Sequence, residues 1–151
     1  MYRKVLVPLD GSPESEKVLD VIEDLVAPGG EIVLLKVIPP MPGLTIGQTT
    51  LTGSQREETE GANARAYLRS VARNMAKEEA NWRFEAVVSR SVAEGITGFA
   101  DRENVDLIAM YTHDRKGLAR LIKGSIASQV QRQAPTEVRV FRPKELAEAS
   151  T

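Results

Sequence analysis

The run EIVLLKVI, Glu31 to Ile38, is the feature that most limits how this chain can fold. Its apolar residues are nearly unbroken, so neither face is available to solvent. A strand buried on both faces is typical of a parallel sheet that helices cover on both sides. The run KVLVPL, Lys4 to Leu9, is too short for a helix and also indicates a buried strand. Two such strands around one helix form a βαβ unit, for which the right-handed crossover is the rule.

The segment between these strands carries the signals of a helix. Ser12 can cap its start, and Pro13 then occupies the first helical position. Apolar residues repeat at helical spacing over the next turns: Val18, Ile22 and Leu25. Pro28-Gly29-Gly30 is expected to end this helix before the second strand begins.

The segment Pro39 to Gln55 has no periodicity and is dominated by Pro, Gly and Thr. Seventeen residues without structure are unusual inside a compact domain, and such loops tend to act as lids or partner-binding segments. A plain surface connection is the alternative interpretation. The sequence predicts that this loop is irregular and leaves its role open.

The remaining chain continues the alternation of helices and strands. A helix with Ala64, Leu68 and Val71 on one face is predicted for Arg56 to Lys77, and a Ser-x-x-Glu capping box at Ser91 predicts another. The other predicted elements are strands at Arg83–Ser89, Val105–Tyr111 and Glu137–Arg142, a helix from about Gly124 to Gln133, and a polar tail at 143–151. Such alternation predicts an α/β doubly wound fold. Ligands of these folds lie beyond the carboxyl ends of the strands, where the strand order reverses.

Composition excludes several classes of function. The chain has 151 residues and fits one domain. Its net charge of −1 and 5% aromatic content argue against a dedicated nucleic-acid-binding protein. It has no cysteine and one histidine, which excludes disulfides and the common Cys or His metal clusters. No apolar run is long enough to span a membrane, so we expect a cytoplasmic protein without a membrane partner.

The segment MYTHDRKGLARLIKGS, Met110 to Ser125, has the pattern of a phosphate-binding loop that leads into a helix. Gly124-Ser125 at a helix start would let backbone N–H groups approach a phosphate closely. Four basic residues and one acidic residue make the loop locally positive: Arg115, Lys116, Arg120, Lys123 and Asp114. A solvated basic loop followed by an ordinary Gly-Ser helix cap is the alternative.

Four segments together give the chain a family resemblance. KVLVPLDGSPESEKVLD, IVLLKVIPP, VAEGITGFADRENVDLIAM and GLARLIKGSIASQVQRQAPTEVRVFRP resemble the universal stress protein family in order and spacing. The resemblance covers nearly the whole chain, as one domain over residues 1–142. It implies a five-stranded parallel sheet of order 3-2-1-4-5 with helices on both faces. It also implies an adenine-nucleotide site, with ATP or AMP held together with Mg²⁺.

The motif of the nucleotide-binding branch of that family is Gly-x-x-Gly, followed by nine residues and then Gly-Ser or Gly-Thr. Here the pattern is Tyr111-Thr112-His113-Asp114, nine residues, then Gly124-Ser125. The resemblance implies that Asp10 binds the ribose or adenine and that Gly124 and Ser125 hold phosphates. The full implied set of nucleotide-binding residues is Leu9, Asp10, Val37, Met110, Tyr111, Asp114, Gly124 and Ser125.

Two motif glycines are replaced, and both replacements have a physical cost. Glycine permits close approach of the backbone to the ligand, whereas Tyr111 would place a ring in the ribose or phosphate space. The Asp114 carboxylate at about 5 Å from a phosphate would cost about 3 kcal/mol at an effective dielectric constant of 20. This cost corresponds to a roughly hundredfold loss of affinity. Basic neighbours could offset this cost, or Asp114 could serve as a Mg²⁺ ligand.

Two functions therefore compete. One is a regulatory protein that binds ATP or AMP with weakened affinity, and the other is an interaction module of the same family without a nucleotide. An enzyme is not expected, because His113 has no Ser or Cys nucleophile placed beside it and there is no Walker-type motif. Asp10 could also be a simple turn residue. The last strand, Glu137 to Arg142, would lie at the sheet edge and predicts a homodimer.

Overall fold

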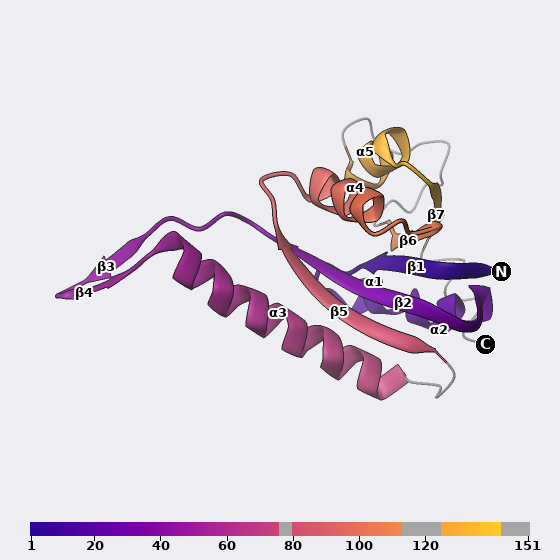
Figure 1. Cartoon of the computed structure of the whole chain (residues 1–151), viewed down its shortest axis with the longest axis horizontal. Coiled ribbons are helices and arrows are strands. Elements are labelled where there is room, and N and C mark those ends of the chain that lie inside the picture. Colours follow the sequence, from indigo (N-terminus) through magenta and orange to yellow (C-terminus); the bar gives the residue numbers. More distant parts are fainter. Residues whose placement is uncertain (76–79, 113–124, 143–151) are drawn as a thin grey trace.

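The chain folds around one parallel sheet of five strands (Figure 1), as given by a computed structural model that describes residues 1–75, 80–112 and 125–142. The strands are β1 (Tyr2–Pro8), β2 (Val26–Ile38), β5 (Asn81–Val88), β6 (Leu107–Tyr111) and β7 (Glu137–Phe141). They lie in the order β5-β2-β1-β6-β7, and each neighbouring pair is parallel. Counted along the chain, this is the order 3-2-1-4-5. The predicted α/β doubly wound fold is confirmed.

Helices cover both faces of the sheet (Figure 1). One face packs against α1 (Pro13–Glu16), α2 (Leu19–Ile22), the short 3-10 helix η1 (Glu23–Leu25) and α3 (Gly53–Met75), and the other against α4 (Val92–Arg102) and α5 (Ile126–Gln133). Val5 and Val7 of β1 pack into the first layer, whereas Leu6 packs into the second. All three are fully buried, as are residues 32–35 of β2. The nearly unbroken apolar runs of the sequence are therefore explained by burial on both faces.

The first helical segment is shorter and more broken than predicted. Ser12 caps α1 as expected, since its hydroxyl accepts from the N–H of Ser15, and Pro13 follows at the first helical position. However, helical structure ends at Leu25, and Pro28-Gly29-Gly30 lies inside β2 instead of ending the helix. The register between β1 and β2 shifts there, from Tyr2↔Val26 to Lys4↔Glu31. Gly29 has a φ of +78°, so glycine permits this irregular entry into the strand.

The prediction of an irregular loop at Pro39 to Gln55 was wrong. This segment contains an antiparallel hairpin of β3 (Leu44–Ile46) and β4 (Thr49–Leu51), and α3 begins at Gly53. Gly47 opens the two-residue turn with a φ of +61°, a value that such hairpin turns require. Thr52 and Gln55 form a reciprocal capping box, with N–H···O distances of 2.8 and 3.1 Å. The Thr-x-x-Gln spacing was the signal in the sequence that could have located this helix start.

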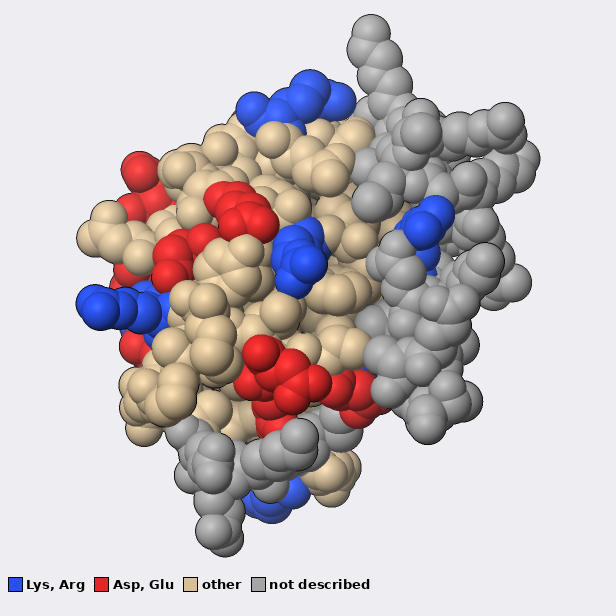
Figure 2. All heavy atoms as spheres, turned by 90° about the vertical axis from the view of Figure 1, so that its right-hand side faces the viewer, with Lys and Arg blue, Asp and Glu red and all other residues tan. Residues whose placement is uncertain are grey.

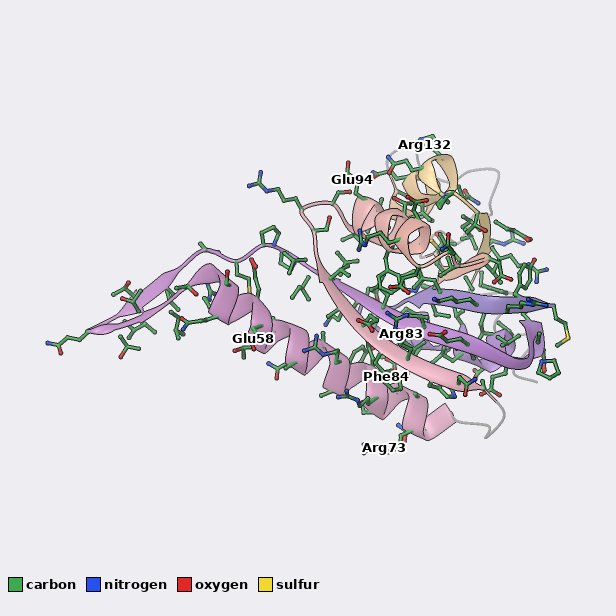
Figure 3. All side chains as sticks on the ribbon, in the orientation of Figure 1. Glu58, Arg73, Arg83, Phe84, Glu94 and Arg132 are labelled. Carbon is green, nitrogen blue, oxygen red and sulfur yellow. The ribbon has the colours of Figure 1, made fainter. Side chains whose placement is uncertain are left out.

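The other elements lie close to their predicted positions. Ser91 caps α4 by accepting from the N–H of Glu94, and the predicted core face of α3 is buried at Ala64, Leu68 and Val71. Phe84 of β5 packs into the same layer as α3 (Figure 3). The polar tail at 143–151 lies outside the described residues.

Charged side chains close the amino end of the sheet. The guanidinium of Arg83 donates to the Glu103 carboxylate at 2.8 and 3.2 Å, and Lys4 Nζ lies 3.1 Å from the same carboxylate. Arg83 Nε also donates to Glu85 at 2.9 Å. The cationic partners, Arg83 first, lower the pKa of Glu103 to about 2. Figure 2 looks onto this end and shows both signs of charge on its surface.

Candidate functional site

A cavity of about 540 Å³ opens at the carboxyl end of the sheet. It lies where β1, β2 and β6 end and where α4 and α5 begin, and β1 and β6 are neighbours as predicted. The lining residues are Pro8, Leu9, Asp10, Ser15, Lys36, Val37, Val92, Ile96, Met110, Tyr111, Thr112, Ser125, Ile126 and Ala127. This is the position at which doubly wound folds hold their ligands.

Most of the predicted site residues meet at this cavity. Its wall contains six of the eight: Leu9, Asp10, Val37, Met110, Tyr111 and Ser125. Asp114 and Gly124 lie outside the described residues, as does His113. Their predicted roles, including Mg²⁺ binding by Asp114, stay predictions. Residues about 115 positions apart in the sequence are thus brought together by the parallel sheet alone.

Asp10 forms the turn considered for it and also lies in the wall of the cavity. Its carboxylate accepts from the N–H of Ser12 at 2.8 Å, as in a turn that leads into a helix. Gly11 between them has a φ of +91°, a conformation that glycine adopts without strain. Asp10 is also exposed and lines the cavity. A carboxylate has about four acceptor positions, so the bond to Ser12 does not by itself prevent Asp10 from accepting from a ligand hydroxyl.

Tyr111 forms part of the wall and does not close the cavity. The residue ends β6, is half-buried and packs against the core layer that contains β1, α2 and α3. The volume of about 540 Å³ is present with the Tyr111 side chain in place. That volume lies within the range typical of small-molecule sites. The described part of the motif therefore leaves room for a ligand.

The start of α5 supplies hydrogen-bond donors and partial positive charge. Ser125 caps the helix, and its Oγ accepts from the N–H of Ser128 at 3.1 Å. Ile126 and Ala127 of the first turn also line the cavity. Helix N-termini attract anions through unpaired N–H groups and the helix dipole. The structure places Ser125 and the start of α5, at Ile126, beside the cavity, and the phosphate-binding role of this segment stays a prediction.

Sequence reasoning missed Lys36, which is the only Lys or Arg among the described lining residues. Its Nζ lies 5.3 Å from the centre of the Tyr67 ring, within the range of a cation–π contact. The Tyr67 hydroxyl donates to Glu16 at 3.1 Å. Burial, and then the negative charge of Glu16, raise the pKa of Tyr67. The signal in the sequence was a single lysine inside the apolar run of β2, at the end that faces the cavity.

Comparison with known proteins decides the family. Residues 1–142 match the sequence profile of the Universal stress protein family. The chain belongs to this family. Universal stress protein MJ0531 of Methanocaldococcus jannaschii is 27% identical over 146 residues, which cover 94% of this chain and 83% of that protein.

Solved structures share the fold, among them universal stress proteins. Hypothetical protein MJ0577 superposes with a TM-score of 0.67 at 22% identity, covering 94% of this chain and 96% of that one. A universal stress protein in complex with cAMP superposes with a TM-score of 0.61 at 17% identity, covering 93% of this chain and 97% of that one. The universal stress protein from Archaeoglobus fulgidus in complex with dAMP superposes with a TM-score of 0.59 at 19% identity, covering 92% of this chain and 97% of that one. At these identities the likeness establishes the fold and not the ligand.

This family member shows two further features within the described residues. No group of three or more His, Cys, Asp or Glu side chains there could hold a metal ion. None of the helices in those ranges combines the length and apolar character needed to cross a membrane.

Proposed function

We propose that this chain is a regulatory module that binds an adenine nucleotide in the cavity at the carboxyl end of the sheet. The observation that carries the proposal is the cavity itself, which joins an apolar compartment to the start of α5. Two members of the family are solved with cAMP and dAMP, both adenine nucleotides. Their ligands support the same class of ligand here.

The lining has separate parts suited to the base, the sugar and the phosphate. Leu9, Val37 and Met110 offer apolar surface for a flat base, and the Asp10 carboxylate can accept from ribose hydroxyls. The first turn of α5, after Ser125, suits a phosphate. Lys36 adds one positive charge to the wall. The chain would thus bind the nucleotide through apolar contact and a few oriented polar groups.

The affinity is expected to be weaker than that of a protein with all motif glycines. Tyr111 leaves the cavity open, but Asp114 replaces a motif glycine with a negatively charged residue. We place the role in binding and not in catalysis. The one carboxylate among the described lining residues, Asp10, already accepts from Ser12, and the other charged group in the described wall is the Lys36 ammonium. Phosphate release from ATP above that of an Asp10→Ala control would contradict this assignment.

Calorimetric titration tests the proposal. ATP and AMP, each with Mg²⁺, should bind the native protein with a micromolar dissociation constant and bind the double variant Tyr111→Gly, Asp114→Gly more tightly. Asp10→Asn keeps an acceptor for the Ser12 N–H and removes the charge, so it should lose affinity without loss of stability. Heats of dilution alone for the native protein would overturn the proposal, whether or not the double variant binds.

A second candidate is an interaction module that forms homodimers through the last strand. The supporting observation is that β7, Glu137 to Phe141, is an edge strand of the five-stranded sheet. An edge strand presents unpaired backbone groups that a second copy can pair with. If only the double variant binds a nucleotide, this candidate replaces the first. Light scattering that gives a monomer at micromolar concentration would remove the edge-strand dimer.

A further inference from the structure

The segment from Pro39 to Glu60, here called the arm, projects beyond the rest of the molecule (Figure 1). It contains the β3–β4 hairpin at its tip and the first two turns of α3. None of residues 39–60 is buried, and Gly61 is the first buried residue of α3. The side chains of the hairpin stand clear of the remainder of the protein (Figure 3). The arm contributes little to the core and nothing to the cavity lining described above.

The base of the arm has a defined conformation. Arg56 Nη1 donates to the carbonyl of Pro42 at 2.6 Å, which ties α3 to the chain that enters the hairpin. A Cβ on Gly53 would lie only 2.2 Å from the Met41 carbonyl oxygen, so the two segments approach too closely for any other residue. The capping box of Thr52 and Gln55 fixes the same corner. A structure held by several specific contacts at its base presents its tip in one direction.

The hairpin has one polar face and one apolar face. Thr45 and Thr50 pair across the strands on one face, with their Oγ1 atoms 3.2 Å apart. Directly paired residues of an antiparallel hairpin share a face, and alternate residues point the opposite way. The other face therefore carries the pairs Leu44↔Leu51 and Ile46↔Thr49. Its apolar side chains are 40%, 70% and 42% exposed at Leu44, Ile46 and Leu51.

The arm tip also lacks charge. Residues 39–55 contain no Asp, Glu, Lys, Arg or His, although 27% of the chain is charged. Exposed strand edges are ordinarily protected from self-pairing by charged side chains, above all lysine. An isolated two-stranded hairpin is also only marginally stable in water. The hairpin thus combines an exposed apolar face, unprotected edges and a need for a supporting surface.

We propose that the arm is a self-association surface, on which the hairpins of two copies of this chain pack apolar face to apolar face. Across a two-fold axis, Leu44, Ile46 and Leu51 of one copy would meet the same residues of the other. A second copy suits this surface because an uncharged tip meets its own duplicate without like-charge repulsion. The tip projects, so two copies can meet there without collision of their domains.

The contact is small, which sets its expected strength. Three apolar side chains on each copy bury far less than the area of a standard interface of about 1,600 Å². The association should therefore be reversible and concentration-dependent. The apolar face of the arm is separate from the edge of β7, so a chain that used both surfaces would form assemblies larger than a dimer.

Sedimentation velocity over a range of micromolar concentrations tests the proposal with two matched variants. Ile46→Lys places like charges across the two-fold axis and should abolish the concentration-dependent species. Thr45→Lys adds the same charge to the same strand on the opposite face and should leave that species unchanged. Equal behaviour of both variants, or no association of the native chain through this range, would overturn the proposal. Circular dichroism and nucleotide titration of both variants would establish that the domain is intact.

Cysteine crosslinking distinguishes the arm from the β7 edge. The native chain has no cysteine, so a single introduced thiol reports on one position only. Thr49→Cys lies on the apolar face and should give disulfide-linked dimers under mild oxidation, because such a bond needs Cα atoms within about 7 Å. Thr50→Cys lies on the polar face and should give far fewer. Absence of dimers from Thr49→Cys, or equal yields from both, would show that the hairpins do not meet in this way.

Discussion

At the amino end of the sheet, charged side chains pair with one another, whereas at the carboxyl end the described side chains surround an open cavity. Arg83, Glu103 and Lys4 form ion pairs at 2.8 and 3.1 Å at the amino end. At the carboxyl end, Lys36 lines the cavity, and its Nζ lies 5.3 Å from the centre of the Tyr67 ring. The same parallel strands therefore carry ion pairs at one end and a cavity at the other. Substitutions at each end test how far the two ends act separately.

The largest effect is expected from the loss of Asp106 at the amino end. Its carboxylate oxygens accept from the N–H groups of Arg3 and Lys4, each at 2.8 Å, and thus hold the start of β1. Asp106→Ala should lower the free energy of unfolding by about 2 to 3 kcal/mol, since hydrogen bonds to charged groups contribute about 1.5 kcal/mol or more each. Denaturant unfolding measures this loss.

Two controls accompany this prediction. Asp101→Ala removes an exposed carboxylate from α4 and should change the unfolding free energy by less than about 0.5 kcal/mol. Nucleotide affinity should be unchanged in Asp106→Ala, measured where the variant is fully folded. A clear loss of affinity would show that the two ends are coupled.

A smaller effect is expected from Lys36 at the carboxyl end, and it rests on the proposed nucleotide site. Lys36→Met keeps the length of the side chain and removes its charge, so AMP affinity should fall about tenfold, or about 1.4 kcal/mol. Isothermal titration measures the change. Lys17→Met, which removes an exposed lysine outside the cavity, should leave affinity unchanged. Equal affinities of the two variants would mean that Lys36 does not contact the ligand.

The smallest effect is expected from Glu103, because its ion pairs are partly exposed and solvent screens them. Its pKa is lowered in the folded state from 4.5 to about 2, first by Arg83 and then by Lys4. The folded state therefore binds fewer protons than the unfolded state between these values, and the stabilisation present above pH 4.5 is lost as the pH falls toward 2.

Acid unfolding of Glu103→Gln checks this sign. The variant should be less stable than the native protein at neutral pH, and the difference should shrink as the pH falls below 4.5. High salt should reduce the same difference at neutral pH. A difference that stays constant with pH would show that Glu103 acts through packing and not through its charge.

The sequence alone determined the sheet, its helical layers and the general place of the site. Apolar runs such as residues 31–38 and caps such as Ser12 and Ser91 are local signals, since burial on both faces and helix ends leave direct traces in residue order. Six of the eight predicted site residues line the cavity because each lies at or just after the carboxyl end of a strand, or caps the start of a helix. Parallel strands bring such positions to one edge.

Only the tertiary structure decided the features that depend on contacts between distant segments. The role of Lys36 depends on the position of Tyr67, which lies on another element. The Pro-Gly-Gly segment enters β2 because its pairing with β1 outweighs the local tendency to end a helix there. The hairpin of the arm was hidden because its turn and capping box are short signals among residues that usually form loops. Its apolar face became visible only when strand pairing placed Leu44, Ile46 and Leu51 together.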